Sequence, residues 1–71
     1  MENFLNQMAE LLEVDSVNPQ DEIISFDAWD SLTSLSIIAM ADDEYSVNIS
    51  AQEILNAKTI IGLYQFIQSK K

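Results

Sequence analysis

Apolar residues recur at intervals of three or four positions in several stretches of the chain, the spacing of amphipathic helices. The first stretch predicts a helix over about residues 2–14, with one apolar face made by Phe4, Leu5, Met8, Leu11 and Leu12. A second helix is predicted over residues 31–45, because Asp30 is a suitable N-cap and neither Gly nor Pro follows it within the segment.

Two further helices are predicted towards the end of the chain. Ser50 and Glu53 match the S-x-x-E capping box, which predicts a short third helix that ends at about Ala57. Thr59 then caps a fourth helix, in which apolar residues recur at Ile60, Leu63, Tyr64 and Ile67. Lys70 and Lys71 fall near its carboxyl end, where cations interact favourably with the helix dipole.

Residues 15–30 read as a long loop, since polar residues and Pro19 interrupt the helical pattern there. A loop of this length in so short a chain is either disordered or functional. Its apolar residues favour a functional loop that is pinned across the core: Ile23, Ile24, Phe26 and Trp29. The chain is therefore predicted to be one all-α domain over residues 1–71, a four-helix bundle with a long first loop and a short third helix.

The predicted second helix is apolar on more than one side, and its carboxyl end is acidic. A helix of this kind is either central or leaves an apolar edge for a partner. Three acids, Asp42, Asp43 and Glu44, oppose the helix dipole at that end. They serve either to solvate the helix end or to bind a partner.

The charge balance excludes several classes of function. The chain has 12 acidic residues against three lysines and a net charge of -9, so it should repel nucleic acid and anionic membranes and attract basic surfaces of partner proteins. Simple solubility is the alternative explanation of this charge. The absence of Cys and His argues against thiol catalysis and a metal site, and an EF-hand is rejected because its required Gly is missing. No apolar run is long enough to cross a membrane and the start of the chain is not basic, so a cytoplasmic protein is expected.

Ser31 is the residue best placed to carry chemistry. It follows the long loop and occupies the first turn of the second helix, where unsatisfied backbone N–H groups favour a phosphate. Ser34 and Ser36 compete with it, but they lie within the helix and not at its start.

The chain resembles the acyl carrier proteins over about residues 2–69. The resemblance rests on Asp30-Ser31-Leu32, on the acidic helix end through Tyr45, and on Ala57-Lys58-Thr59-Ile60 before the last helix. It implies that Ser31 receives 4'-phosphopantetheine from coenzyme A, and that the thiol of this arm carries an acyl or aminoacyl group as a thioester. It also implies partners: a phosphopantetheinyl transferase, and loading or processing enzymes with basic docking patches. The candidate contact residues are Asp30, Leu32, Ala39, Asp42, Asp43 and Glu44.

Several positions depart from the usual pattern of this family, which often has Gly at the positions of Ala28 and Ser46. Trp29 replaces a smaller residue, and Thr33 and Ser36 replace acids that fatty-acid carriers often have. These departures favour a dedicated carrier in a specialised pathway over a housekeeping role in fatty-acid synthesis. The expected setting is fatty-acid, polyketide or related biosynthesis, and a monomer is expected. The alternative function is an unmodified acidic adaptor that binds basic proteins. A serine enzyme is rejected, because the chain has no His base.

Overall fold

The computed structural model describes residues 2–70, and these form four α-helices without a β-strand. The helices are α1 (Glu2–Leu11), α2 (Ser31–Tyr45), α3 (Ala51–Ala57) and α4 (Ile60–Lys70), with one turn of 3-10 helix, η1 (Ile23–Ser25), in the first connection. The predicted all-α bundle with a long first loop and a short third helix is confirmed. Lys71, expected near the carboxyl end of the last helix, lies outside the described residues.

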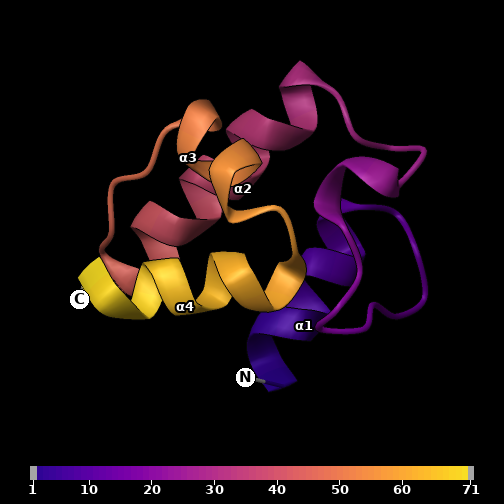
Figure 1. Cartoon of the computed structure of the whole chain (residues 1–71), viewed down its shortest axis with the longest axis horizontal. Helices are drawn as coiled ribbons and strands as arrows, with labels where there is room; N and C mark the ends of the chain where they lie inside the picture. Colours follow the sequence, from indigo (N-terminus) through magenta and orange to yellow (C-terminus); the bar gives the residue numbers. More distant parts are fainter. Residues whose placement is uncertain (1, 71) are drawn as a thin grey trace.

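The helices enclose one apolar core. α1 packs against α2 and α4, and α3 packs against the same two helices (Figure 1). All four helices therefore border the core. The side chains that are almost completely buried come from all four helices and the first connection: Phe4, Met8, Leu12, Ile23, Ile37, Ile54, Ile60, Leu63 and Ile67. Across residues 2–70, none of the helices is both long and apolar enough to span a bilayer.

The first helix is shorter than predicted, since α1 ends at Leu11 and not at about residue 14. Glu13 adopts a left-handed conformation with φ of 59° and donates its N–H to the carbonyl of Glu10. The N–H of Val14 reaches back to the carbonyl of Ala9 at 3.0 Å. These two bonds form a Schellman motif, which satisfies the last carbonyls and turns the chain out of the helix.

The long connection is pinned to the rest of the molecule, as predicted. It runs along one edge of the bundle (Figure 1) and is fastened to the segment between α3 and α4. The N–H of Ile23 donates to the carbonyl of Lys58 at 2.9 Å, and that of Ile60 donates to the carbonyl of Asp21 at 3.0 Å. Of the apolar residues that favoured this pinning, Ile23 is buried, whereas Ile24 is 58% exposed and does not contribute to the core.

The connection between α3 and α4 is unusually tight. Lys58 has φ of 69° and ψ of -54°, and the N–H of Thr59 bonds to the carbonyl of Ala57 at 2.8 Å, which makes a strained γ-turn. The side chain of Thr59 then accepts a bond from the N–H of Gly62 at 3.0 Å, so it caps α4 as predicted. A Cβ at Gly62 would lie 2.3 Å from the carbonyl oxygen of Ala57. Only a glycine therefore lets the two helices approach so closely.

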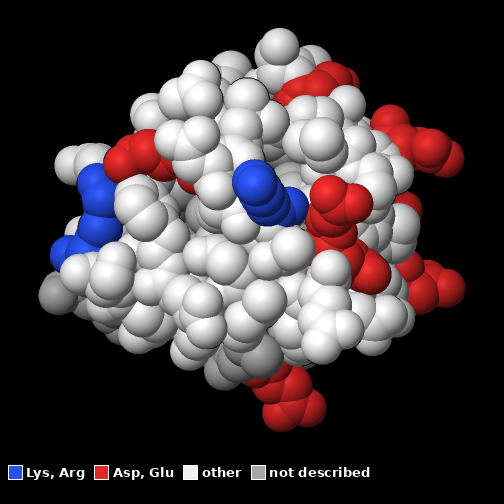
Figure 2. Space-filling view, in the orientation of Figure 1, with Lys and Arg blue, Asp and Glu red and all other residues white. Residues whose placement is uncertain are grey.

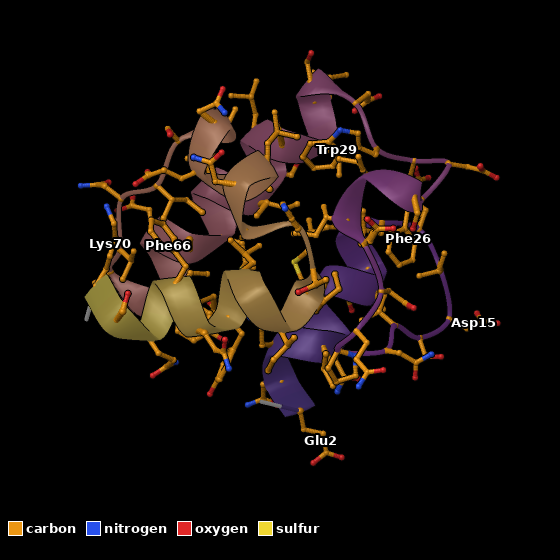
Figure 3. All side chains as sticks on the ribbon, in the orientation of Figure 1. Glu2, Asp15, Phe26, Trp29, Phe66 and Lys70 are labelled. Carbon is orange, nitrogen blue, oxygen red and sulfur yellow. The ribbon has the colours of Figure 1, made fainter. Side chains whose placement is uncertain are left out.

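Acidic side chains dominate the charged surface. On the face shown in Figure 2, basic side chains (blue) occur in two places, and most of the acidic side chains (red) lie around the edge of the view. Lys70 lies beside Phe66 (Figure 3), with its Nζ 5.2 Å from the ring centre and 3.3 Å from Oε2 of Glu53. Most of the negative charge is therefore left without an intramolecular cation, because the described residues contain only two lysines.

Candidate functional site

The start of α2 is held by Asp30, which takes the N-cap position as predicted. Its Oδ1 accepts a hydrogen bond from the N–H of Thr33 at 2.8 Å, and its carbonyl accepts the N–H of Ser34 at 3.0 Å. The hydroxyl of Thr33 donates to the carbonyl of Ala28 at 2.7 Å, which ties the first turn to the preceding loop. The backbone around Ser31 is thus fixed from both sides.

The three serines of α2 have different environments. Ser31 is exposed, and within residues 2–70 its hydroxyl has no hydrogen-bond partner. Ser34 is buried and donates to the carbonyl of Ser31 at 2.8 Å, whereas Ser36 is exposed and donates to the carbonyl of Leu32 at 3.1 Å. Of the three serines, Ser31 is therefore the one whose hydroxyl is exposed and makes no hydrogen bond within the described residues.

A pocket of about 300 Å³ opens beside Ser31 between the start of α2 and α3. It is lined by Trp29, Asp30, Ser31, Ser34, Ala51 and Leu55. Trp29 lies on the segment before α2 (Figure 3) and packs partly against the core, as expected of an anchor, but it also forms a wall of this pocket. A larger pocket of about 570 Å³ lies between the end of α1 and residues 25–28, and Ser31 does not line it.

The electrostatics at Ser31 combine a favourable helix terminus with a neighbouring negative charge. The hydrogen bond from the backbone N–H of Thr33 is the largest of the effects that hold the pKa of Asp30 below its ordinary value. Asp30 is therefore ionised at neutral pH. The helix dipole at the amino end of α2 favours an anion on the Ser31 oxygen, whereas the adjacent carboxylate of Asp30 opposes it. In residues 2–70, no three acidic side chains come together in a way that could hold a metal ion.

The candidate contact residues lie on the exposed surface of α2. Leu32 is 73% exposed, and Asp30, Ala39, Asp42, Asp43 and Glu44 are exposed as well. The helix does not bring them all to one place, since a rise of 1.5 Å per residue sets Asp42 about 17 Å from Ser31 along the axis. The face is thus apolar near Ser31 and acidic at the far end.

Two exposed leucines near Ser31 were not among the residues expected at the site. Leu35 is 60% exposed and follows Leu32 by three positions, so helical spacing alone could have placed both on one face. Leu55 is 44% exposed on α3 and reaches the pocket at Ser31 only through the packing of α3 against α2, for which the sequence holds no signal.

A small helical bundle with an accessible serine at a helix start is the arrangement that the resemblance to carrier proteins led us to expect. Comparison with known protein families agrees, because the model described as "Phosphopantetheine attachment site" matches residues 2–67. The chain belongs to this family, whose members carry 4'-phosphopantetheine covalently, are not catalytic, and interact with phosphopantetheinyl transferases and biosynthetic enzymes. No curated protein and no solved structure gives a significant match.

The residues around Ser31 fit such a group. The hydroxyl of Ser31 has no partner among the described residues, the helix dipole at the start of α2 would favour the negative charge of a phosphodiester, and the adjoining pocket offers the apolar surfaces of Trp29 and Leu55. When bound, the arm supplies the thiol that this cysteine-free chain lacks.

Proposed function

We propose that Ser31 is the attachment residue, and that the protein presents an acyl or aminoacyl thioester on its phosphopantetheine arm to partner enzymes. The observation that carries the proposal is the difference between the three serines of α2. Ser31 has an exposed hydroxyl without a partner, whereas the hydroxyls of Ser34 and Ser36 are both bonded to the helix backbone.

In the attachment step, the Oγ atom of Ser31 forms a bond to the phosphorus of coenzyme A that bears the pantetheine. The bond between this phosphorus and the bridging oxygen of the diphosphate breaks, and adenosine 3',5'-bisphosphate leaves. We assign to the transferase the base that accepts the hydroxyl proton, because this chain has no His and the carboxylate of Asp30 is engaged as the N-cap of α2. The N-cap at Asp30 keeps the backbone of Ser31 fixed for the reaction.

The surface around Ser31 supports a dedicated carrier and not a general carrier of fatty-acid synthesis. No charged residue occurs between Asp30 and Asp42, because Thr33 and Ser36 stand where fatty-acid carriers often have acids. The exposed side chains of Leu32 and Leu35 therefore have no charged neighbour on α2 near Ser31. We infer that loading and processing enzymes contact apolar side chains close to Ser31, and that their basic patches meet Asp42, Asp43 and Glu44. We further propose that residues 1–71 form one carrier domain, and that this domain is monomeric and works in the cytoplasm.

The proposal is tested by incubating the full chain with coenzyme A and phosphopantetheinyl transferases of broad specificity, followed by intact-mass spectrometry. We expect the mass to increase by one phosphopantetheine in the parent chain and in Ser36→Ala, and to remain unchanged in Ser31→Ala. An unmodified parent chain that still binds basic proteins would instead support the acidic adaptor.

A further inference from the structure

Thr33 is buried near the start of α2, although its side chain is polar. It is 9% exposed, and its hydroxyl donates to the carbonyl of Ala28 at 2.7 Å, five residues earlier in the chain. A hydrogen bond that is shielded from solvent is costly to lose, because the polar group left behind has no partner. This bond is therefore a fixed part of the connection between the first loop and α2.

The bond made by Thr33 differs from the serine bonds of the same helix, because it leaves the helix. Ser34 and Ser36 donate to carbonyls of α2 itself, three and four residues earlier in the chain. The hydroxyl of Thr33 instead reaches back past the N-cap to the loop. It therefore closes a short stretch of backbone, residues 28–33, which is called the junction below.

The junction carries both Ser31 and Trp29. The backbone N–H of Thr33 donates to Oδ1 of Asp30 at 2.8 Å, so Thr33 holds the junction at two points. Trp29 lies on the segment before α2 (Figure 3), and its side chain lines the pocket that Ser31 also lines. The positions of the serine and of the indole relative to the helix start thus depend on the bonds of Thr33.

We infer that Thr33 is a positioning residue for the attachment of phosphopantetheine, and that it acts by closing the junction and so fixing the position of the Oγ atom of Ser31. The inference rests on the proposed attachment at Ser31. Reacting atoms have to lie about 3–3.5 Å apart, and a displacement of about 1 Å can cost on the order of a hundredfold in rate. Thr33 acts through the backbone of the junction and not on the reacting phosphorus.

The contact with Ala28 requires a side chain that donates a hydrogen bond. Valine has nearly the same shape as threonine but no hydroxyl, whereas serine keeps the hydroxyl and lacks the methyl group. An ionised aspartate only accepts hydrogen bonds, so it would repel the carbonyl oxygen of Ala28. Thr33→Val and Thr33→Asp should therefore open the junction, and Thr33→Ser should keep it closed.

Trp29 is the only tryptophan of the chain, so its fluorescence reports on the junction. Opening of the junction in Thr33→Val should move the emission maximum to longer wavelength and increase quenching by acrylamide, because the partly buried indole becomes more exposed. Thr33→Ser should keep the emission of the parent. The matched control is Ser36→Ala, which removes a serine bond within α2 and should leave the emission unchanged.

The rate of modification tests the positioning itself. The full chain is combined with coenzyme A and a phosphopantetheinyl transferase of broad specificity, at a temperature at which circular dichroism shows each variant to be folded. In Thr33→Val, kcat/KM for the carrier should fall by about five- to fiftyfold, whereas KM for coenzyme A, which the transferase binds, should not change. Thr33→Ser and Ser36→Ala should react within about twofold of the parent. A role in stability alone would not slow the reaction of a folded variant.

The results that would overturn the inference are a parent-like emission or a parent-like rate in Thr33→Val, or a Thr33→Ser variant as slow as Thr33→Val. Thr33→Asp is a second check, since it should react no faster than Thr33→Val, and a parent-like rate would again refute the positioning role. A parent chain that gains no mass would instead refute the attachment at Ser31. The emission of the variants would still test the junction in that case, so the two failures are distinguishable.

Discussion

The Oδ1 atom of Asp30 accepts a 2.8 Å hydrogen bond from the backbone N–H of Thr33, across the turn of helix that contains Ser31. The acidic residue before the candidate attachment serine therefore has a structural role whether or not it also contacts a partner. It stabilises the helix start on which the position of the serine depends.

Replacing Asp30 separates these two roles. Asp30→Ala removes the cap and should lower the melting temperature by about 4–8 °C, the usual effect of losing one N-cap in a chain of this size. Asp30→Asn keeps a good capping side chain but removes the charge, so its melting temperature should stay close to that of the parent. Circular dichroism measures both.

The rate of modification of the same two variants then reports on recognition. If the asparagine variant is modified at the parent rate, Asp30 acts as a cap alone, and if it is folded but modified slowly, its charge contacts the transferase. A melting temperature for Asp30→Ala equal to that of the parent would contradict the cap.

Gly62 is predicted to be intolerant of a single added carbon. An alanine in a helix usually stabilises relative to glycine, by about 1 kcal/mol. Here the new Cβ would meet the backbone oxygen of Ala57, so Gly62→Ala should lower the free energy of unfolding by about 1–3 kcal/mol. Gln65→Ala, at an exposed position of the same helix, should be nearly neutral. Chemical denaturation gives both values, and a stabilised Gly62→Ala would contradict the close approach of α3 and α4.

Ser46 ends α2 in a left-handed conformation, with φ of 56°. Its N–H still bonds to the carbonyl of Asp42 at 3.0 Å, so the conformation belongs to the helix cap. Glycine adopts this conformation without the steric cost of a Cβ, so Ser46→Gly should raise the free energy of unfolding by about 0.5–1 kcal/mol. Ser36→Gly, inside the same helix, should lower it by a similar amount. Equal effects of the two substitutions would refute this explanation.

The capping box of α3 is predicted to make stability depend on pH. A bond from the backbone N–H of Ser50 lowers the pKa of Glu53, and Lys70 lowers it further. The resulting stability is present above the pKa of an unfolded glutamate, about 4.3, and is lost as the pH falls through the lower folded pKa. Glu53→Gln should therefore be less stable than the parent at neutral pH, and the difference should shrink as the pH falls through the lowered pKa of Glu53. A difference that stays the same as the pH falls would rule out this linkage.

Much of the fold follows from local sequence signals. The bounds of α2 follow from the cap at Asp30 and the apolar spacing, and the start of α3 follows from Ser50 and Glu53, whose two reciprocal bonds both form. The end of α1 could not be predicted, because Glu13 adopts a conformation that usually requires glycine. The hydrogen bond from the N–H of Ile23 to the carbonyl of Lys58 could not be predicted either, because it joins backbone groups that are distant in sequence.

In the candidate site too, some features could be predicted from local sequence and others could not. The position of Ser31 at the start of a helix follows from local pattern, and so does the exposure of Leu32. The pocket beside Ser31 depends on how α3 packs against α2, and the periodicity of a single helix does not predict that packing.

The most direct test of the central claim is to locate the modification within the chain. The parent chain, modified by a phosphopantetheinyl transferase with coenzyme A, is digested, and the peptide that spans α2 is fragmented in a mass spectrometer. The account predicts that the whole added mass lies on Ser31 and that Ser34 and Ser36 carry none. Added mass on either of those two serines, or on no residue of α2, would contradict it.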